Sequence, residues 1–114
     1  MDKMKNKLYE GMYVLSATLG EESRKKALDK ILHGITEKGG EIHKIHDMGR
    51  KKLAYEIRGK KEGYYFLLYF SVTPGAIIEL WREYNLHEDM IRFMTLAAEE
   101  VKETLDFKPL KSAN

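Results

Sequence analysis

The stretch from Tyr64 to Val72, YYFLLYFSV, restricts the fold more than any other part of this 114-residue chain. Successive side chains of a β-strand point to opposite faces, and here both faces are apolar. One face carries Tyr64, Phe66, Leu68, Phe70 and Val72, and the other carries Tyr65, Leu67, Tyr69 and Ser71. A strand of this kind is typical of the centre of a sheet, with strands on both edges and a layer covering at least one face. We therefore predict a central strand here, with the Tyr64 face turned towards the core.

A second strand precedes it and is joined to it by a charged turn. The second strand begins at Glu41, and its apolar spacing of three before Gly49 predicts a bulge or bend there. Its last part alternates and places Leu53, Tyr55 and Ile57 on one face, which we expect to pack in the core. The turn 58–63, RGKKEG, has the two glycines that suit a hairpin loop.

The remaining periodicity predicts two helices and two further strands. The predicted elements are a strand over 8–15, a helix from Glu21 to Gly39-Gly40, a helix from Thr73-Pro74 to Asn85, and a strand over 87–96. The order βαββαβ indicates an α+β fold of the ferredoxin-like, split βαβ type. Right-handed crossovers then place two helices on one face of a four-stranded antiparallel sheet, with the first and third strands central. We expect one domain over residues 1–96 and a flexible charged C-terminal tail over 97–114.

Composition limits the classes of function. The chain has no cysteine, which excludes disulfides and thiolate metal sites. Its longest apolar run, Tyr64–Phe70, is far shorter than the roughly 20 residues of a membrane span. The basic N-terminus has no apolar segment after it, so we expect a soluble intracellular protein.

Charge is distributed unevenly along the chain. Residues 42–61 contain seven Lys or Arg and two acids, a net charge of +5, whereas residues 74–114 contain five cations and eight acids, a net charge of −3. Clustered cations indicate a surface that binds a polyanion, but they also protect an exposed edge strand against aggregation. Charge alone leaves both interpretations open.

Catalytic sites find little support in the sequence. His43 and His46 lie on opposite faces of a strand, and Asp29, His33 and Glu37 share a helix face whose neighbouring lysines favour exposure to solvent. An acylphosphatase-like enzyme with this fold binds phosphate in the loop after the first strand. Here that loop, SATLGEES, carries two acids before Arg24, and acids repel phosphate. We keep this enzyme as the less favoured alternative.

An RNA-recognition module is a second alternative. Its signature runs close to residues 62–69, EGYYFLLY, but Glu62 stands where a basic residue belongs and Tyr65 where a small one belongs. That module stacks bases on aromatic side chains of the sheet face. In this chain the aromatics at the matching positions, Tyr64 and Phe66, belong to the predicted core face.

The run GRKKLAYEIR over residues 49–58 resembles the signature of the bacterial small-subunit ribosomal protein six family. The likeness extends to Leu8-Tyr9-Glu10, Gly39-Gly40, Gly63-Tyr64-Tyr65 and Ile91-Arg92-Phe93, so it covers about residues 8 to 96. It implies a non-catalytic structural protein of the cytoplasmic ribosome, without cofactor, metal ion, membrane or small-molecule substrate. The implied partners are ribosomal RNA of the central domain of the small subunit and small-subunit ribosomal protein eighteen, bound as a heterodimer.

The resemblance and the charge pattern together select the candidate site residues. The candidate RNA-phosphate contacts are Arg50, Lys51, Lys52 and Arg58 on the signature, with Lys60, Lys61 and Arg92 as secondary candidates. On the open sheet face, Tyr65, Leu67 and Tyr69 are expected to form an exposed apolar patch, which usually marks a protein interface. We assign this patch to the protein partner or to the chain's own tail.

Overall fold

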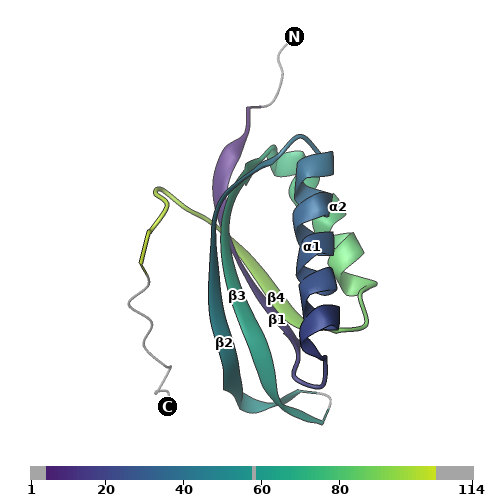
Figure 1. The fold of residues 1–114 in the computed structure, drawn as a ribbon. Coiled ribbons are helices and arrows are strands. Elements are labelled where there is room, and N and C mark those ends of the chain that lie inside the picture. The colour runs from purple at the N-terminus through teal and green to yellow at the C-terminus, as the bar shows by residue number, and fades with distance from the viewer. Residues whose placement is uncertain (1–4, 58, 105–114) are drawn as a thin grey trace.

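The computed structural model describes residues 5–57 and 59–104. The predicted order βαββαβ is confirmed. The elements are β1 (Lys7–Ser16), α1 (Glu21–Glu37), β2 (Glu41–Ile57), β3 (Lys60–Val72), α2 (Pro74–Asn85) and β4 (Met90–Ala97). The strands pair antiparallel in the order β2-β3-β1-β4, so β1 and β3 are central, as predicted. Figure 1 shows both helices on one face of the sheet.

The core lies between that face and the two helices. The Tyr64 face of β3 belongs to it as predicted, and α1 contributes Ala27, Ile31 and Ile35 at helical spacing. The buried cluster consists of Tyr13, Leu15, Ala27, Ile31, Ile35, Phe66, Leu68, Phe70, Val72, Ala76, Ile77, Leu80, Tyr84 and Met90. Both faces of β3 are apolar, but only the Tyr64 face packs against the helices.

The helix ends depart in detail from the sequence patterns. Thr73 stands at the N-cap of α2, but its side chain makes no capping hydrogen bond. The helix ends at Asn85 as the sequence predicts, and Leu86 caps it in a right-handed conformation. Gly34 packs against α2 rather than the sheet, since a Cβ there would lie 2.9 Å from Oε1 of Glu83. No helix among the described residues is long and apolar enough to cross a membrane.

The β2–β3 hairpin is bent and extends beyond the helices (Figure 1). The predicted bulge before Gly49 is confirmed as a register shift between Asp47 and Gly49, where Gly49 takes a φ of 80°. The turn is shorter than predicted because β3 already begins at Lys60, so that of the two turn glycines Gly59 lies outside the strands and Gly63 does not. Gly63 is instead a strand residue, and a Cβ there would lie 2.5 Å from Cγ1 of Val14.

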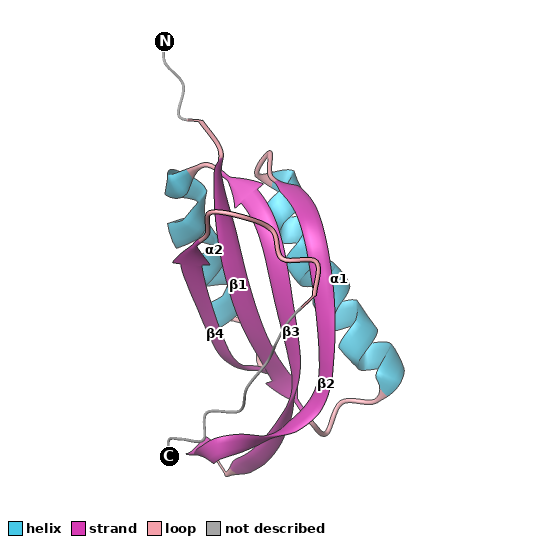
Figure 2. Ribbon diagram, turned by 90° about the vertical axis from the view of Figure 1, so that its left-hand side faces the viewer, coloured by secondary structure: helices cyan, strands magenta, loops and turns pink. Residues whose placement is uncertain are grey.

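The chain continues past β4 across the face of the sheet that the helices leave open. Figure 2 shows this segment, residues 98–104, running from the end of β4 over β1 and β3 towards β2. We call it the C-terminal strap. Its first contact is the hydrogen bond from the Ala98 N–H to the Leu8 carbonyl, 3.0 Å. Residues 105–114 lie outside the described residues, so the division into a domain over 1–96 and a flexible tail over 97–114 stays a prediction.

Candidate nucleic-acid and partner interface

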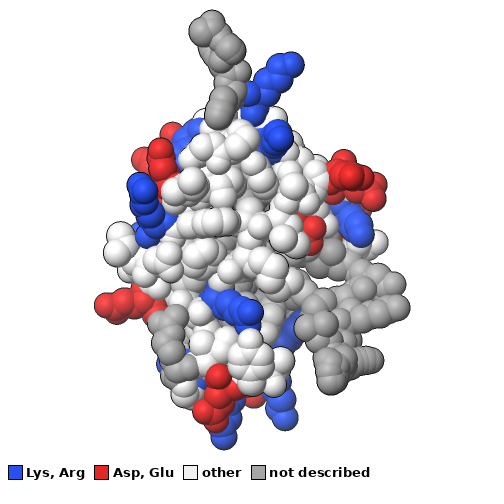
Figure 3. All heavy atoms as spheres, turned by 180° about the vertical axis from the view of Figure 1, so that it is seen from behind, with Lys and Arg blue, Asp and Glu red and all other residues white. Residues whose placement is uncertain are grey.

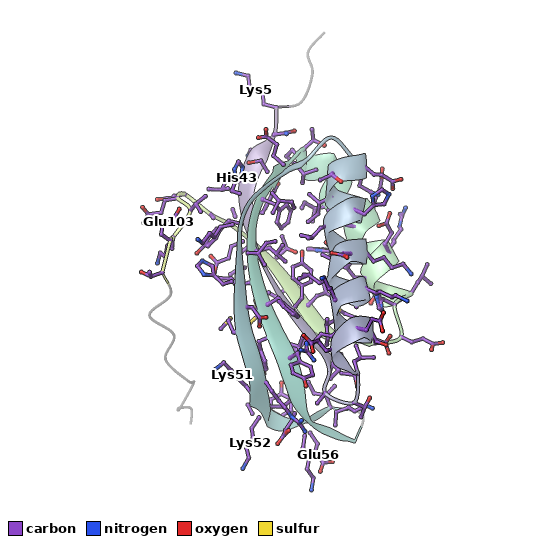
Figure 4. The ribbon with its side chains drawn as sticks, viewed as in Figure 1. Lys5, His43, Lys51, Lys52, Glu56 and Glu103 are labelled. Carbon is purple, nitrogen blue, oxygen red and sulfur yellow. The ribbon has the colours of Figure 1, made fainter. Side chains whose placement is uncertain are left out.

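The hairpin end, which we define as residues 49–62, holds most of the predicted RNA contacts. Figure 4 shows Lys51, Lys52 and Glu56 at this end of the sheet, pointing away from the helices. The ladder pairs Lys51 with Gly63 and Lys52 with Glu62. Lys52 is exposed and Lys51 half-buried. The bend of β2 therefore presents two consecutive lysines beyond the packed part of the molecule.

Arg50 stands beside these lysines but is held by an acid. Its Nε donates to Oε1 of Glu62 over 2.5 Å. The hydrogen bond and the negative charge of Glu62 raise the pKa of Arg50, with a smaller contribution from Tyr64. Arg50, Lys51, Lys52 and Glu62 line one open hollow. A guanidinium carries five N–H donors, so the Glu62 contact leaves others available to a phosphate.

The structure separates the remaining hairpin candidates from this hollow. Lys61 is exposed, and its Nζ lies 4.0 Å from Oε2 of Glu56. Lys60 is half-buried and lines a different cavity, of about 110 Å³, together with Glu88 and Asp89. Arg58 lies outside the described residues. The predicted set is therefore spread over several surfaces, with Arg50, Lys51 and Lys52 as its compact group.

Acids accompany the cations throughout the hairpin end. It carries six Lys or Arg and the two acids Glu56 and Glu62, a net charge of +4. Figure 3, viewed from behind, shows cationic and anionic atoms side by side at the end of the molecule where the hairpin lies. The surface is cationic on balance, and each acid pairs with one cation.

Sequence reasoning missed one arginine of this region. Arg24, in α1, places its guanidinium 3.9 Å from the ring centroid of Tyr64 in β3. Tyr64 is the ladder partner of Arg50, so the two arginines approach the same tyrosine from different elements. Forty residues separate Arg24 from Tyr64, and no sequence pattern marks such a pair.

The bent hairpin also encloses an apolar groove on the open face, with a volume of about 190 Å³. We call it the hairpin groove. It is lined by Met12, Val14, Leu53, Ala54, Tyr55, Ile57, Tyr65, Arg92, Phe93 and Met94. Arg92 closes one side of it, since its Nη1 donates to the Tyr55 hydroxyl over 3.2 Å. This places Arg92 across the groove from the hairpin, away from Arg50 and Lys52.

The prediction that Leu53, Tyr55 and Ile57 pack in the core is wrong. Tyr55 is 63% exposed, and Leu53 and Ile57 are half-buried in the hairpin groove. Register shifts at Ile42/Lys44, Asp47/Gly49 and Lys52/Ile57 change which face each β2 side chain occupies. A period-two pattern cannot be followed across such shifts, because each one turns the later side chains to another face.

The prediction of an exposed patch at Tyr65, Leu67 and Tyr69 is also wrong as regards exposure. Leu67 is 3% and Tyr69 1% exposed, and Tyr65 is half-buried in the hairpin groove. Tyr69 is too covered for a base to stack on its ring, which argues against the RNA-recognition alternative. Burial raises the pKa of Tyr65, and the positive charge of Arg92 partly offsets that effect.

The cover over Tyr69 comes from the C-terminal strap. The imidazole Nε2 of His46 lies 2.8 Å from the Lys102 carbonyl oxygen, and Nζ of Lys44 lies 3.2 Å from a Glu103 carboxylate oxygen. Burial raises the pKa of the Tyr69 hydroxyl, an effect that a backbone hydrogen bond from Lys102 opposes. Of the two occupants expected for this part of the sheet face, the chain's own C-terminal segment is the one present in the structure.

No group of three or more His, Asp or Glu among the residues 5–57 and 59–104 is arranged to hold a metal ion. His33 pairs with Glu37 on the exposed surface of α1, at 3.2 Å. His43 contacts the Ser71 hydroxyl at 2.7 Å and His46 contacts the strap, so the two β2 histidines serve separate contacts.

Comparisons with known proteins agree with the fold. The family model described as "Ribosomal protein S6" matches residues 8–97. The "Small ribosomal subunit protein bS6" of Chlamydia pneumoniae is 67% identical over 110 residues, which cover 96% of this chain and 98% of that protein. That of Chlamydia caviae is 63% identical over the same span. The crystal structure of 30S ribosomal protein S6 from Thermotoga maritima matches with a TM-score of 0.78 at 32% identity, covering 82% of this chain and 89% of that one.

Proposed function

The chain belongs to the ribosomal protein S6 family, and on that basis we propose that it binds central-domain RNA of the small subunit as a heterodimer with small-subunit ribosomal protein eighteen. Two surfaces support the proposal. The hairpin end carries the cations that RNA backbone requires, and the hairpin groove offers an apolar site for a protein.

Family membership itself confirms several predictions from the sequence. The chain is a structural component of the small ribosomal subunit, located with the ribosome in the cytoplasm, and is therefore associated with ribosomal RNA. It is not an enzyme, which removes the acylphosphatase alternative.

One observation carries the RNA part of the proposal: Arg50, Lys51 and Lys52 meet in one hollow at the end of the hairpin. Phosphate contacts supply most of the affinity of proteins for nucleic acids, and each one releases condensed counterions. Arg58, Lys60, Lys61 and Arg92 are proposed as secondary contacts, because they are cationic but lie apart from this hollow or, for Arg58, outside the described residues.

Filter binding of central-domain RNA over about 50 to 300 mM salt tests the RNA contacts. The double variant Lys51→Gln/Lys52→Gln should bind more weakly, with a logarithmic salt slope shallower by about 1.5 for two lost contacts. The matched control Lys26→Gln/Lys30→Gln removes the same charge from α1 and should bind like wild type. Equal losses in the two variants would show that only net charge matters, and equal affinity of the wild type for unrelated RNA would refute the proposal.

The hairpin groove supports the proposal that the chain binds ribosomal protein eighteen. Its lining is apolar except for Arg92 and the tyrosine hydroxyls, and it holds Tyr65 from the predicted interface. Buried aromatic and aliphatic anchors dominate protein interfaces, and a rim arginine adds hydrogen bonds. We propose that ribosomal protein eighteen places an apolar side chain in this groove. Leu67 and Tyr69 are buried in the free protein, so they belong to the proposed interface only where the partner rearranges the cover over them.

Calorimetric titration with ribosomal protein eighteen tests the groove. Tyr55→Ser removes an exposed ring from its wall and should weaken the heterodimer by about tenfold or more. Leu86→Ser is the matched control, because Leu86 is 82% exposed and lies outside the groove. Unchanged affinity of Tyr55→Ser would place the partner elsewhere.

A further inference from the structure

Arg24 and Arg50 converge on one tyrosine from two elements that are distant in sequence. The Arg24 guanidinium lies 3.9 Å from the ring centroid of Tyr64, within the range of a cation–π contact. Arg50 is the ladder partner of Tyr64, and its Nε is fixed by Glu62 over 2.5 Å. Tyr64 is itself half-buried at the margin of the core, so its ring holds Arg24 in place, while Glu62 holds Arg50.

The acids near Arg24 leave its charge unneutralised. Glu21 and Glu22 precede it in the first turn of α1, and both are exposed. Within the described residues Arg24 makes no ion pair, and its side chain contact is the Tyr64 ring. Arg50, by contrast, has Glu62. Arg24 is therefore a positioned cation that no ion pair among residues 5–57 and 59–104 explains.

We propose that Arg24 is a further RNA-phosphate contact, which extends the RNA surface from the hairpin end onto the helix side of the molecule. This inference rests on the proposed RNA-binding function. Arg24 stacks on Tyr64 and Arg50 is the ladder partner of that tyrosine, and both carry planar guanidinium donors of the kind that bind phosphate. The phosphate that Arg24 contacts belongs to the RNA backbone that also passes Lys51 and Lys52.

Stacking explains why an arginine suits this place better than a lysine. The planar guanidinium presents donors in a fixed fork that matches phosphate oxygens, and a ring beneath it restrains its rotamers before binding. Less side-chain entropy is then lost when the phosphate arrives. A lysine would keep the positive charge, but its flexible ammonium group lacks the planar, fixed arrangement of donors.

Three single variants test the inference by filter binding of central-domain RNA at several salt concentrations. Arg24→Gln should lower affinity about 3- to 10-fold and reduce the logarithmic salt slope by about 0.7 to 0.9, the value for one contact. Arg24→Lys should fall between wild type and Arg24→Gln, because it keeps the charge and loses the stacked fork. The matched control Lys30→Gln, an exposed cation of the same helix, should bind like wild type.

The outcomes separate this inference from the proposed function. If Arg24→Gln binds like Lys30→Gln while Lys51→Gln/Lys52→Gln binds weakly, the inference falls and the proposed function stands. If the wild type shows no preference for central-domain RNA, both fall. If Arg24→Lys binds as well as wild type, the stacked fork has no role and the inference in this form is overturned. Unfolding followed by the fluorescence of Trp81, the single tryptophan, confirms that each variant is folded.

Discussion

The hydroxyl groups of Tyr13 and Tyr84 lie 3.0 Å apart in the core and join β1 to α2 by a hydrogen bond. Their rings meet edge to face, with centroids 5.2 Å apart. Both side chains are buried, so neither hydroxyl has water as an alternative partner. Because both hydroxyls are buried and joined to each other, this pair links the stability of the protein to alkaline pH.

Stability should fall as the pH rises above 10. Burial, followed by the charge and hydrogen bond of Tyr84, raises the pKa of Tyr13, and burial raises the pKa of Tyr84 to about 12. An unfolded tyrosine has a pKa of about 10, so between pH 10 and 12 the unfolded state has lost protons that the folded state keeps. The free energy of unfolding should then fall by about 1.4 kcal/mol per pH unit for each of the two tyrosines.

The variant Tyr84→Phe isolates this effect. At pH 7 it should cost about 1 to 2 kcal/mol, because the Tyr13 hydroxyl loses its partner. Above pH 10 the stability difference between wild type and variant should narrow, since the variant has one titrating group fewer. Urea unfolding followed by circular dichroism measures both values, and a difference that stays constant from pH 8 to 12 would contradict the assignment.

Gly11→Ala should destabilise the protein by about 1 to 3 kcal/mol, the usual range for overpacking. A Cβ at Gly11 would lie 2.7 Å from the Tyr13 hydroxyl oxygen and 2.9 Å from its ring, and Tyr84 holds that ring in place. Gly75→Ala is the matched control, because nothing lies within 4 Å of a Cβ there. It should leave stability unchanged or raise it slightly through helix propensity. Similar thermal midpoints for the two variants would contradict the close approach of the Tyr13 side chain to Gly11.

Truncation after Ala97 should destabilise the protein by about 1 to 3 kcal/mol, because it removes the strap contacts to Lys44 and His46 and uncovers Tyr69. Truncation after Thr104 keeps the strap and should leave the thermal midpoint unchanged. Hydrogen exchange at the β3 amides gives a second readout, with faster exchange only in the shorter chain. If both truncated chains unfold like the full one, the strap contributes nothing to the free protein.

Tyr55→Ala should cost less than about 1 kcal/mol of stability, because this side chain is 63% exposed in the hairpin groove. Phe66→Ala, at a core position of β3, should cost about 3 to 5 kcal/mol. Chemical denaturation of the two variants compares them directly. A loss of several kcal/mol of stability in Tyr55→Ala would instead support the core position that the alternating pattern predicts.

The sequence determined the fold because its periodicities are local and follow from backbone geometry. The two-faced strand at 64–72, the helical stripe at Ala27, Ile31 and Ile35, and the order of elements were sufficient to predict the sheet and its central strands. The GRKKLAYEIR run likewise predicted the family, which the comparisons confirm. The compact cation group at 50–52 was predictable for the same reason, since its members are adjacent in the chain.

Tertiary structure alone decided where side chains from distant segments meet. Register shifts in β2 moved Leu53, Tyr55 and Ile57 out of the core and into a groove against Arg92. The strap covered Tyr69, and helix packing brought Arg24 to Tyr64. The spacing before Gly49 predicted one bulge, but the face that each later side chain occupies depends on all three register shifts in β2. The other two results depend on contacts between residues far apart in sequence, which periodicity does not show.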